Sequence, residues 1–232
     1  MEKRIRKHIL VSASAAVLLF AAPAIAQLDR ITNRDAIAAL KAALEKGSQA
    51  AVAGLGRTDG FFGDPRVKIP LPDSLKRAES LMRRVGMGKY ADELVLAMNR
   101  AAEQAVPEAK QLFIDSVRKM SVQDAKGILT GGETAGTEYF QRTTRSQLHG
   151  RFLPIVQQST DKVGVAHKYN QYAEKGVALG VVKKEQADLD EYVTQKALDG
   201  LYLMVAEEEK KIRKDPVSAG RAIIKKVFSA LK

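Results

Sequence analysis

The sequence lacks cysteine and tryptophan altogether, and its aromatic residues are 7 phenylalanines and 6 tyrosines among 232 residues. Without cysteine, the chain has no disulfide, no thiolate ligand for zinc, no cysteine nucleophile and no cysteine to carry a lipid anchor. Apolar residues make up 45% and charged residues 28%, which are ordinary values for a globular protein, so disorder is not expected. The length suits one domain with a substantial hydrophobic core.

Long apolar runs are also missing, except for one near the start of the chain. Residues 9–22 are apolar apart from two serines, and basic residues precede them within 3–7. Pro-Ala-Ile-Ala then ends at Ala26, which is a small-residue A-x-A site. A membrane-spanning helix needs about 20 apolar residues, so this pattern predicts a secretory signal peptide over residues 1–26, cleaved after Ala26. Gln27 stands where a lipoprotein would carry cysteine.

The expected location is therefore the periplasm. The segment has no Arg-Arg pair, which favours the general secretion route over twin-arginine export. Secretion into the medium and an uncleaved membrane anchor are the alternatives. The longest later apolar run lies around 201–206, so we expect no transmembrane span once the signal peptide is removed.

Residues 27–232 are predicted to form a single all-α domain, a multi-helix bundle. Apolar residues recur at spacings of three and four between glycines, prolines and capping residues. The expected helices cover residues 34–53, 74–85, 89–105, 107–120, 122–129, 133–150, 154–163, 165–178, 188–214 and 216–231. The stretch 198–205 is apolar on nearly every side, which indicates an enclosed helix, and Gly200 would let a neighbour approach closely.

One segment, about 54–72, breaks the helical pattern with four glycines and three prolines. We expect an irregular loop there. Val67, Ile69 and Leu71 alternate with Arg, Lys and Pro, so a short edge strand or hairpin is an open alternative.

Four stretches carry a family resemblance: residues 98–107, 120–132 (MSVQDAKGILTGG), 139–144 and 193–217. Together they resemble the bacterial domain-of-unknown-function family 4197, which consists mainly of exported proteins of Gram-negative bacteria. The resemblance spans nearly all of residues 28–230. It implies a mostly helical single domain outside the cytoplasm, and it implies no activity and no catalytic residues.

Motifs for catalysis and cofactors are lacking. His149 and His167 fall in no zinc-binding pattern. Gly131 and Gly136 have the spacing of a phosphate-binding loop, but the Lys-Ser/Thr that should follow is absent. There is no nucleophile elbow and no dinucleotide-binding motif. We therefore name no catalytic residue, metal site or cofactor, and favour a binding protein over an enzyme.

Three groups of residues are candidates for binding. In the irregular loop, Phe61 and Phe62 lie beside Arg57, Arg66 and Lys68, and they could line a groove for an apolar ligand with an acidic head. The alternative is that the two aromatic side chains cover the helical core.

The second and third groups are basic. Gly131 and Gly132 precede a predicted helix start, where free amides attract anions, and Arg142 and Arg145 share one helix face nearby. The predicted last helix carries Arg221, Lys225, Lys226 and Phe228, which could lie on an anionic membrane surface. An ordinary pair of helix caps, and docking of the last helix on its own bundle, are the alternatives.

These features favour one function and leave two others open. The favoured function is a non-enzymatic binding or structural protein of the cell envelope that recognises an amphiphilic or anionic ligand or a protein partner. One alternative is an enzyme whose carboxylates and arginines only the fold brings together. The other is a peripheral membrane protein that acts through its basic C-terminal helix. Nucleic acid is not an expected partner despite the net charge of +11, because an exported chain meets little of it and no binding motif is present.

Overall fold

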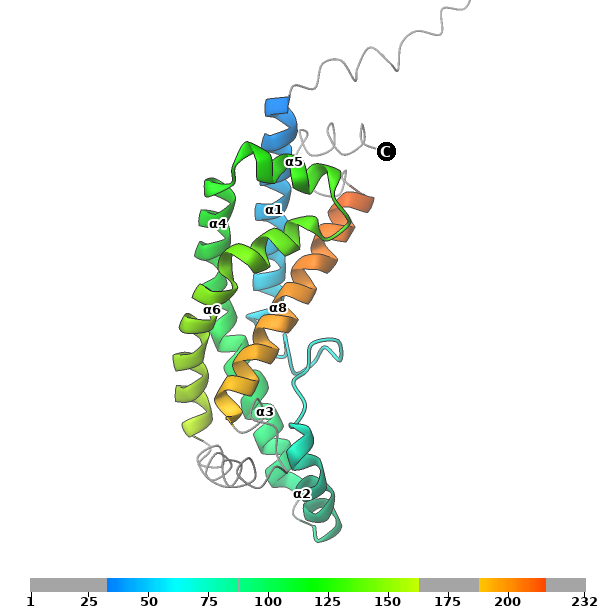
Figure 1. Cartoon of the computed structure of the whole chain (residues 1–232). Coiled ribbons are helices and arrows are strands. Elements are labelled where there is room, and N and C mark those ends of the chain that lie inside the picture. The colour runs from blue at the N-terminus through cyan, green and yellow to red at the C-terminus, as the bar shows by residue number, and fades with distance from the viewer. Residues whose placement is uncertain (1–32, 87, 163–187, 216–232) are drawn as a thin grey trace, which may run out of the picture.

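The computed structural model describes residues 33–86, 88–162 and 188–215, which fold as a helical bundle with no strand among them (Figure 1). The elements are α1 (Asn33–Leu55), α2 (Asp73–Arg84), α3 (Gly88–Ala105), the 3-10 helix η2 (Val106–Glu108), α4 (Ala109–Lys119), α5 (Val122–Thr130), α6 (Ala135–Asp161) and α8 (Leu189–Lys214). The predicted all-α bundle is confirmed. The predicted signal peptide, the helices over 165–178 and 216–231, and the candidate residues Arg221, Lys225, Lys226 and Phe228 lie outside the described residues.

Several helix ends form where local chemistry predicts them. The Ser121 hydroxyl accepts a hydrogen bond from the Asp124 amide at 3.0 Å, and the Asp124 carboxylate accepts one from the Ser121 amide at 3.2 Å. This reciprocal capping box starts α5. The Asp188 carboxylate caps α8 by accepting hydrogen bonds from the amides of Asp190 and Glu191 at 2.9 and 3.0 Å. Pro107 lies in η2, where it needs no amide hydrogen for a helical bond.

One predicted boundary is wrong. The two helices expected over 133–150 and 154–163 are a single helix, α6, which continues through Pro154. A proline inside a helix costs about 3 kcal/mol, because it removes one backbone hydrogen bond and crowds the preceding turn. Leu148, Phe152 and Val156 form one buried face that runs past the proline. Packing of this face against the bundle offsets that cost.

The edge strand considered for residues 67–71 does not form. Val67, Ile69 and Leu71 are buried, as the alternation of the sequence predicts. An edge strand also needs a neighbouring strand for its backbone groups. Here the side chain of Asn99 on α3 takes that place, because it pairs with both the amide and the carbonyl of Ile69.

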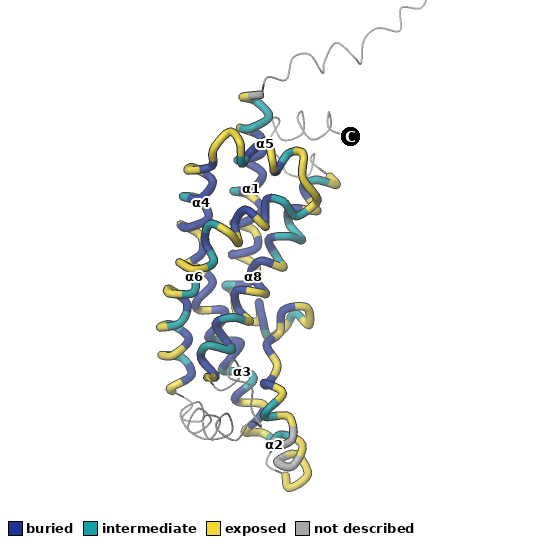
Figure 2. Tube along the Cα trace, viewed as in Figure 1, coloured by how far each residue is buried: buried dark blue, intermediate teal, exposed yellow. Residues whose placement is uncertain are grey.

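Helix α8 crosses the centre of the bundle and packs mainly against α6 and α1 (Figure 1). Most of its 198–205 stretch is buried, as predicted, although Leu203 is 41% exposed. Figure 2 shows buried residues on the sides by which the helices face one another. The Tyr202 hydroxyl lies 2.8 Å from the Thr144 hydroxyl, and burial raises the pKa of Tyr202 to about 12.

Helix α2 differs from the others because it packs chiefly against α3 and is exposed over much of its length (Figure 2). The irregular loop, residues 56–72, joins α2 to α1. Within the described ranges, no helix combines the length and the apolar character that crossing a membrane requires.

We expect Gly200→Ala to lower the free energy of unfolding by about 1–3 kcal/mol, as added volume in a packed core does. A methyl group there would meet Phe61 Cε1 at 2.8 Å and Val67 Cβ at 3.3 Å. Urea titration followed by circular dichroism measures the change. Gly127→Ala is the matched control, since nothing lies within 4 Å of a Cβ at that position and alanine favours a helix by about 1 kcal/mol. Equal stabilisation of both variants would contradict the close contact.

Candidate functional site

The irregular loop is fixed to α3 by a buried carboxylate. Glu103 is 4% exposed, and its Oε1 accepts hydrogen bonds from the amides of Phe61 at 3.0 Å and Phe62 at 3.2 Å. Its Oε2 accepts from Arg100 Nη1 at 2.6 Å. Arg100 Nη2 in turn binds the carboxylate of Asp59 at 2.6 Å, so the same cluster holds the start of the loop.

A second buried polar side chain, one turn earlier on α3, holds the end of the loop. Asn99 is fully buried; its Oδ1 accepts from the Ile69 amide at 2.8 Å, and its Nδ2 donates to the Ile69 carbonyl at 2.9 Å. Nδ2 also donates to the Val95 carbonyl at 2.7 Å. Because Asn99 and Glu103 are four residues apart, they share one face of α3, and that face determines the path of the loop.

This path leaves an open groove of about 560 Å³ between the loop, α2 and α3. Its lining combines apolar residues from the loop and α3 with charged residues from all three segments: Phe62, Pro65, Lys68, Pro70, Leu71, Glu79, Arg83, Asp92 and Val95. Lys68 Nζ lies 4.0 Å from the centroid of the Phe62 ring, which is a cation–π arrangement. In the part of the chain that the structure describes, Lys68 forms no ion pair.

The other cation of the groove, Arg83, is held by two carboxylates. Its Nη2 lies 2.5 Å from Asp92 Oδ1 and 2.9 Å from Glu79 Oε1. The hydrogen bond from Arg83 holds the pKa of Asp92 below its ordinary value, and the nearby positive charge of Lys68 acts in the same direction. The two carboxylates raise the pKa of Arg83 above its ordinary value. Arg83 therefore joins α2 to α3 at one wall of the groove.

The structure brings together only part of the first predicted group. Phe62 and Lys68 line the groove, whereas Phe61 is fully buried against Gly200. Phe61 therefore does not line the groove; its side chain packs in the core, as the alternative expected of both aromatic residues. Arg66 forms an ion pair with Asp64 at 2.5 Å, and Arg57 is exposed and absent from the groove lining.

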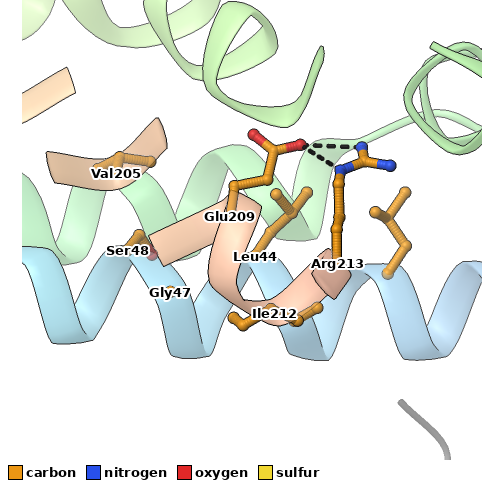
Figure 3. Close-up of a pocket in the computed structure, with 9 residues that line it drawn as sticks. Leu44, Gly47, Ser48, Val205, Glu209, Ile212 and Arg213 are labelled. Carbon is orange, nitrogen blue, oxygen red and sulfur yellow. Dashed lines mark hydrogen bonds and ion pairs between the residues drawn. The ribbon is translucent and has the colours of Figure 1, made fainter. Parts of the chain in front are cut away.

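At the second predicted site, the chain itself supplies the anion. Glu209 of α8 is 7% exposed and accepts hydrogen bonds from the amides of Gly136 at 3.0 Å and Thr137 at 2.8 Å. Its carboxylate also accepts from the Thr137 hydroxyl. Figure 3 shows its bonds from Arg213. Amides at the start of a helix attract a negative charge. At the start of α6, the carboxylate of Glu209 already provides that charge.

The remaining residues of that group do not converge on Gly131 and Gly132, which are exposed. Arg142 lies 3.3 Å from Asp124 of α5. Arg145 donates to Gln195 at 3.0 Å and to Asp199 at 2.7 Å on α8. These arginines connect helices, and we assign no anion site to them.

The cavity beside Glu209, between α1 and α8, is too small for a ligand (Figure 3). It measures about 10 Å³, which is room for about one water molecule. Its lining is mainly apolar and comes from both helices: Leu40, Ala43, Leu44, Gly47, Ser48, Val205, Glu209, Ile212 and Arg213.

Within the described ranges, no group of three or more His, Asp or Glu side chains is placed to hold a metal ion. His149 Nε2 lies 2.8 Å from Glu191 Oε2, so this histidine joins α6 to α8. Burial raises the pKa of Glu191, but hydrogen bonds from Gln195 and His149 outweigh this effect and leave the pKa below its ordinary value.

Sequence reasoning missed the groove residues outside the loop, namely Glu79, Arg83, Asp92 and Val95, and the two residues that hold the loop. A signal for the latter was present. Asn99 and Glu103 flank Met98 and Ala102 on α3, so a helical projection places them next to its buried face. Polar residues at such positions need partners. No comparable signal exists for Arg83 and Asp92, because exposed charges occur throughout the chain.

A family model matches residues 30–229, which include every residue that the structure describes. The description of that family reads "Protein of unknown function (DUF4197)". The predicted family resemblance is therefore confirmed. No curated protein and no solved structure matches the chain.

We expect Glu103→Gln to loosen the irregular loop. A glutamine amide offers one acceptor oxygen in place of two, so it can keep the two loop amides only by turning its NH2 group towards Arg100, which also binds Asp59 at the start of the loop. The lost bond from Arg100 costs about 1–3 kcal/mol. Trypsin cleavage after Arg57, Arg66 or Lys68, followed by mass spectrometry, should become about fivefold faster or more, because cleavage follows the population of the open loop.

Glu108→Gln is the control for this experiment. Glu108 is exposed and pairs loosely with Arg151 at 3.5 Å, and such surface pairs contribute at most about 1 kcal/mol. Its cleavage pattern should match that of the unmodified chain. If the loop of Glu103→Gln is cleaved at the same rate as the loop of the unmodified chain, the carboxylate does not hold the loop.

Proposed function

Because the chain belongs to the family described as protein of unknown function (DUF4197), whose description names no activity, we propose its function from the groove. It is a non-enzymatic binding protein of the cell envelope that holds a single-chain amphiphile with an anionic head group. The groove between the irregular loop, α2 and α3 is the binding site.

The size and lining of the groove support this proposal. Its volume of about 560 Å³ falls within the range of small-molecule sites, about 300–1,000 Å³. Phe62, Pro65, Pro70, Leu71 and Val95 give it an apolar surface. Covering such a surface contributes about 25 cal/mol for each Å² removed from water, which favours a hydrocarbon chain as the occupant.

The observation that carries the proposal is the position of Lys68. Its ammonium group lies over the Phe62 ring, at the apolar part of the groove, and it forms no ion pair with a carboxylate of the described residues. A hydrocarbon chain on Phe62 would bring an attached acidic head close to this charge. Hydrogen bonds to charged groups contribute about 1.5–3 kcal/mol, so Lys68 gives a preference for anions.

The envelope location rests on the first 26 residues. Their basic start, short apolar run and A-x-A site have the build of a secretory signal. A protein exported in this way meets membrane-derived amphiphiles, which agrees with the chemistry of the groove.

Binding is tested by titrating the purified full chain with dodecyl phosphate in a calorimeter. We expect binding to the unmodified chain and a loss of about tenfold or more in Lys68→Gln, since a charge-assisted bond of about 1.5 kcal/mol is worth a factor of ten. Dodecyltrimethylammonium, with the same hydrocarbon chain and a positive head, should bind weakly or not at all.

Lys126→Gln is the matched control for that titration, because Lys126 is an exposed lysine on α5 that does not line the groove. It should bind dodecyl phosphate like the unmodified chain. Absence of binding to the unmodified chain, or equal losses in both lysine variants, would remove the proposed site.

Export is tested by expressing the full chain in a Gram-negative host and measuring its intact mass in the periplasmic fraction. We expect a mature protein that begins at Gln27, because cleavage should follow Ala26. Ala26→Arg should block processing, since the site requires a small residue. A cytoplasmic protein that retains residues 1–26 would overturn the predicted signal.

A further inference from the structure

Arg83 is held from its own helix as well as by Asp92 on α3. Its Nε and Nη2 donate to Glu79 Oε1 at 3.0 and 2.9 Å, an i,i+4 pair on α2. Gly88 leaves room for the arginine, since a Cβ there would meet Arg83 Cγ at 3.1 Å and Nη1 at 3.2 Å. The guanidinium group would therefore keep its orientation without any bond to Asp92.

Asp92 approaches the outer side of this guanidinium group as an acidic ligand would. Its Oδ1 lies 2.5 Å from Arg83 Nη2 and its Oδ2 lies 3.4 Å from Nη1. Two nitrogens facing two oxygens form the fork by which arginine recognises carboxylates and phosphates. Asp92, Arg83 and Lys68 all line the groove, and the charge of Lys68 also acts on Asp92. The carboxylate thus binds one cation of the site and lies in the electrostatic field of the other.

The exposure of Asp92 distinguishes it from the acids that hold the fold. Its side chain is 63% exposed, against 26% for Glu79. Glu209, which serves as the internal anion at the start of α6, is 7% exposed and receives bonds from two amides, a hydroxyl and Arg213. Removing Glu209 would leave several buried donors without a partner, whereas Asp92 can turn into solvent and leave Arg83 bound to Glu79.

We propose that Asp92 occupies the position of the ligand's anionic head group, and that the ligand binds by displacing this carboxylate from Arg83. Arg83 and Lys68 then hold the head group together, and Asp92 lowers the affinity by competing for the same cations. This inference rests on the proposed function, because it assigns the head-group contacts of the same groove.

The test compares dodecyl phosphate binding to the unmodified chain, Asp92→Asn and Arg83→Gln by calorimetry. Removing the competing charge should tighten binding to Asp92→Asn by about fivefold to tenfold, which corresponds to about 1 kcal/mol of relieved competition for an exposed pair. Arg83→Gln should bind about tenfold more weakly, since it loses a charge-assisted bond. Glu93→Gln is the matched control, because it removes the same charge one residue along α3 from an exposed side chain outside the groove.

Two further probes separate the head group from the whole amphiphile. Inorganic phosphate alone should bind far more weakly than dodecyl phosphate but gain in the same proportion from Asp92→Asn. Dodecyltrimethylammonium should gain nothing from Asp92→Asn, because a cation does not compete with the carboxylate for Arg83.

The outcomes separate this inference from the proposed function. Binding to the unmodified chain with equal or weaker binding to Asp92→Asn overturns the displacement of Asp92 and leaves the groove as a binding site. Equal gains in Asp92→Asn and Glu93→Gln also overturn it, since the effect would then come from net charge alone. Binding to neither the unmodified chain nor Asp92→Asn overturns both proposals.

Discussion

The groove depends on two buried polar side chains of α3. The irregular loop has no disulfide, and within the described residues no strand pairs with it, so its backbone groups need other partners. Glu103 accepts the amides of Phe61 and Phe62, and Asn99 pairs with both backbone groups of Ile69. A buried polar group without a partner costs about 1–3 kcal/mol. The loop backbone and these two side chains of α3 are hydrogen-bond partners, so moving either would leave buried polar groups unpaired. The loop wall of the groove therefore stays in place.

Three carboxylates show how burial decides what an acid can do in this fold. Glu103 and Glu209 are each below 10% exposure, and each binds backbone amides from a distant part of the chain together with an arginine of its own helix. They act as fixed connections between segments. Asp92 makes a similar contact with Arg83, but in solvent. Water can replace its bonds at little cost. Of these three carboxylates, Asp92 is the one that lines the groove.

Much of the fold could be predicted from the sequence, because helix starts and apolar faces are local properties. The capping box at Ser121 and the enclosed stretch of α8 both follow from spacing alone. The continuity of α6 through Pro154 could not, since it depends on neighbours that offset a local penalty. The site was predicted in part. Phe62 and Lys68 stood out by type, but the position of Phe61 depends on Gly200, and Arg83 meets Asp92 only because α2 turns back on α3. Gly200 did indicate a close approach, but the identity of the neighbour and the meeting of Arg83 with Asp92 leave no local pattern.

The contact between Phe61 and Gly200 sets an order of assembly. Phe61 fills the space that Gly200 leaves on α8, and its amide is bound by Glu103 on α3. A chain is synthesised from its N-terminus, so the loop emerges well before α8. Its aromatic ring then has no place to pack, and the groove cannot take its final shape until nearly the whole domain has arrived. A partly emerged chain therefore lacks the finished groove, and the contact of Phe61 with α8 marks a completed fold.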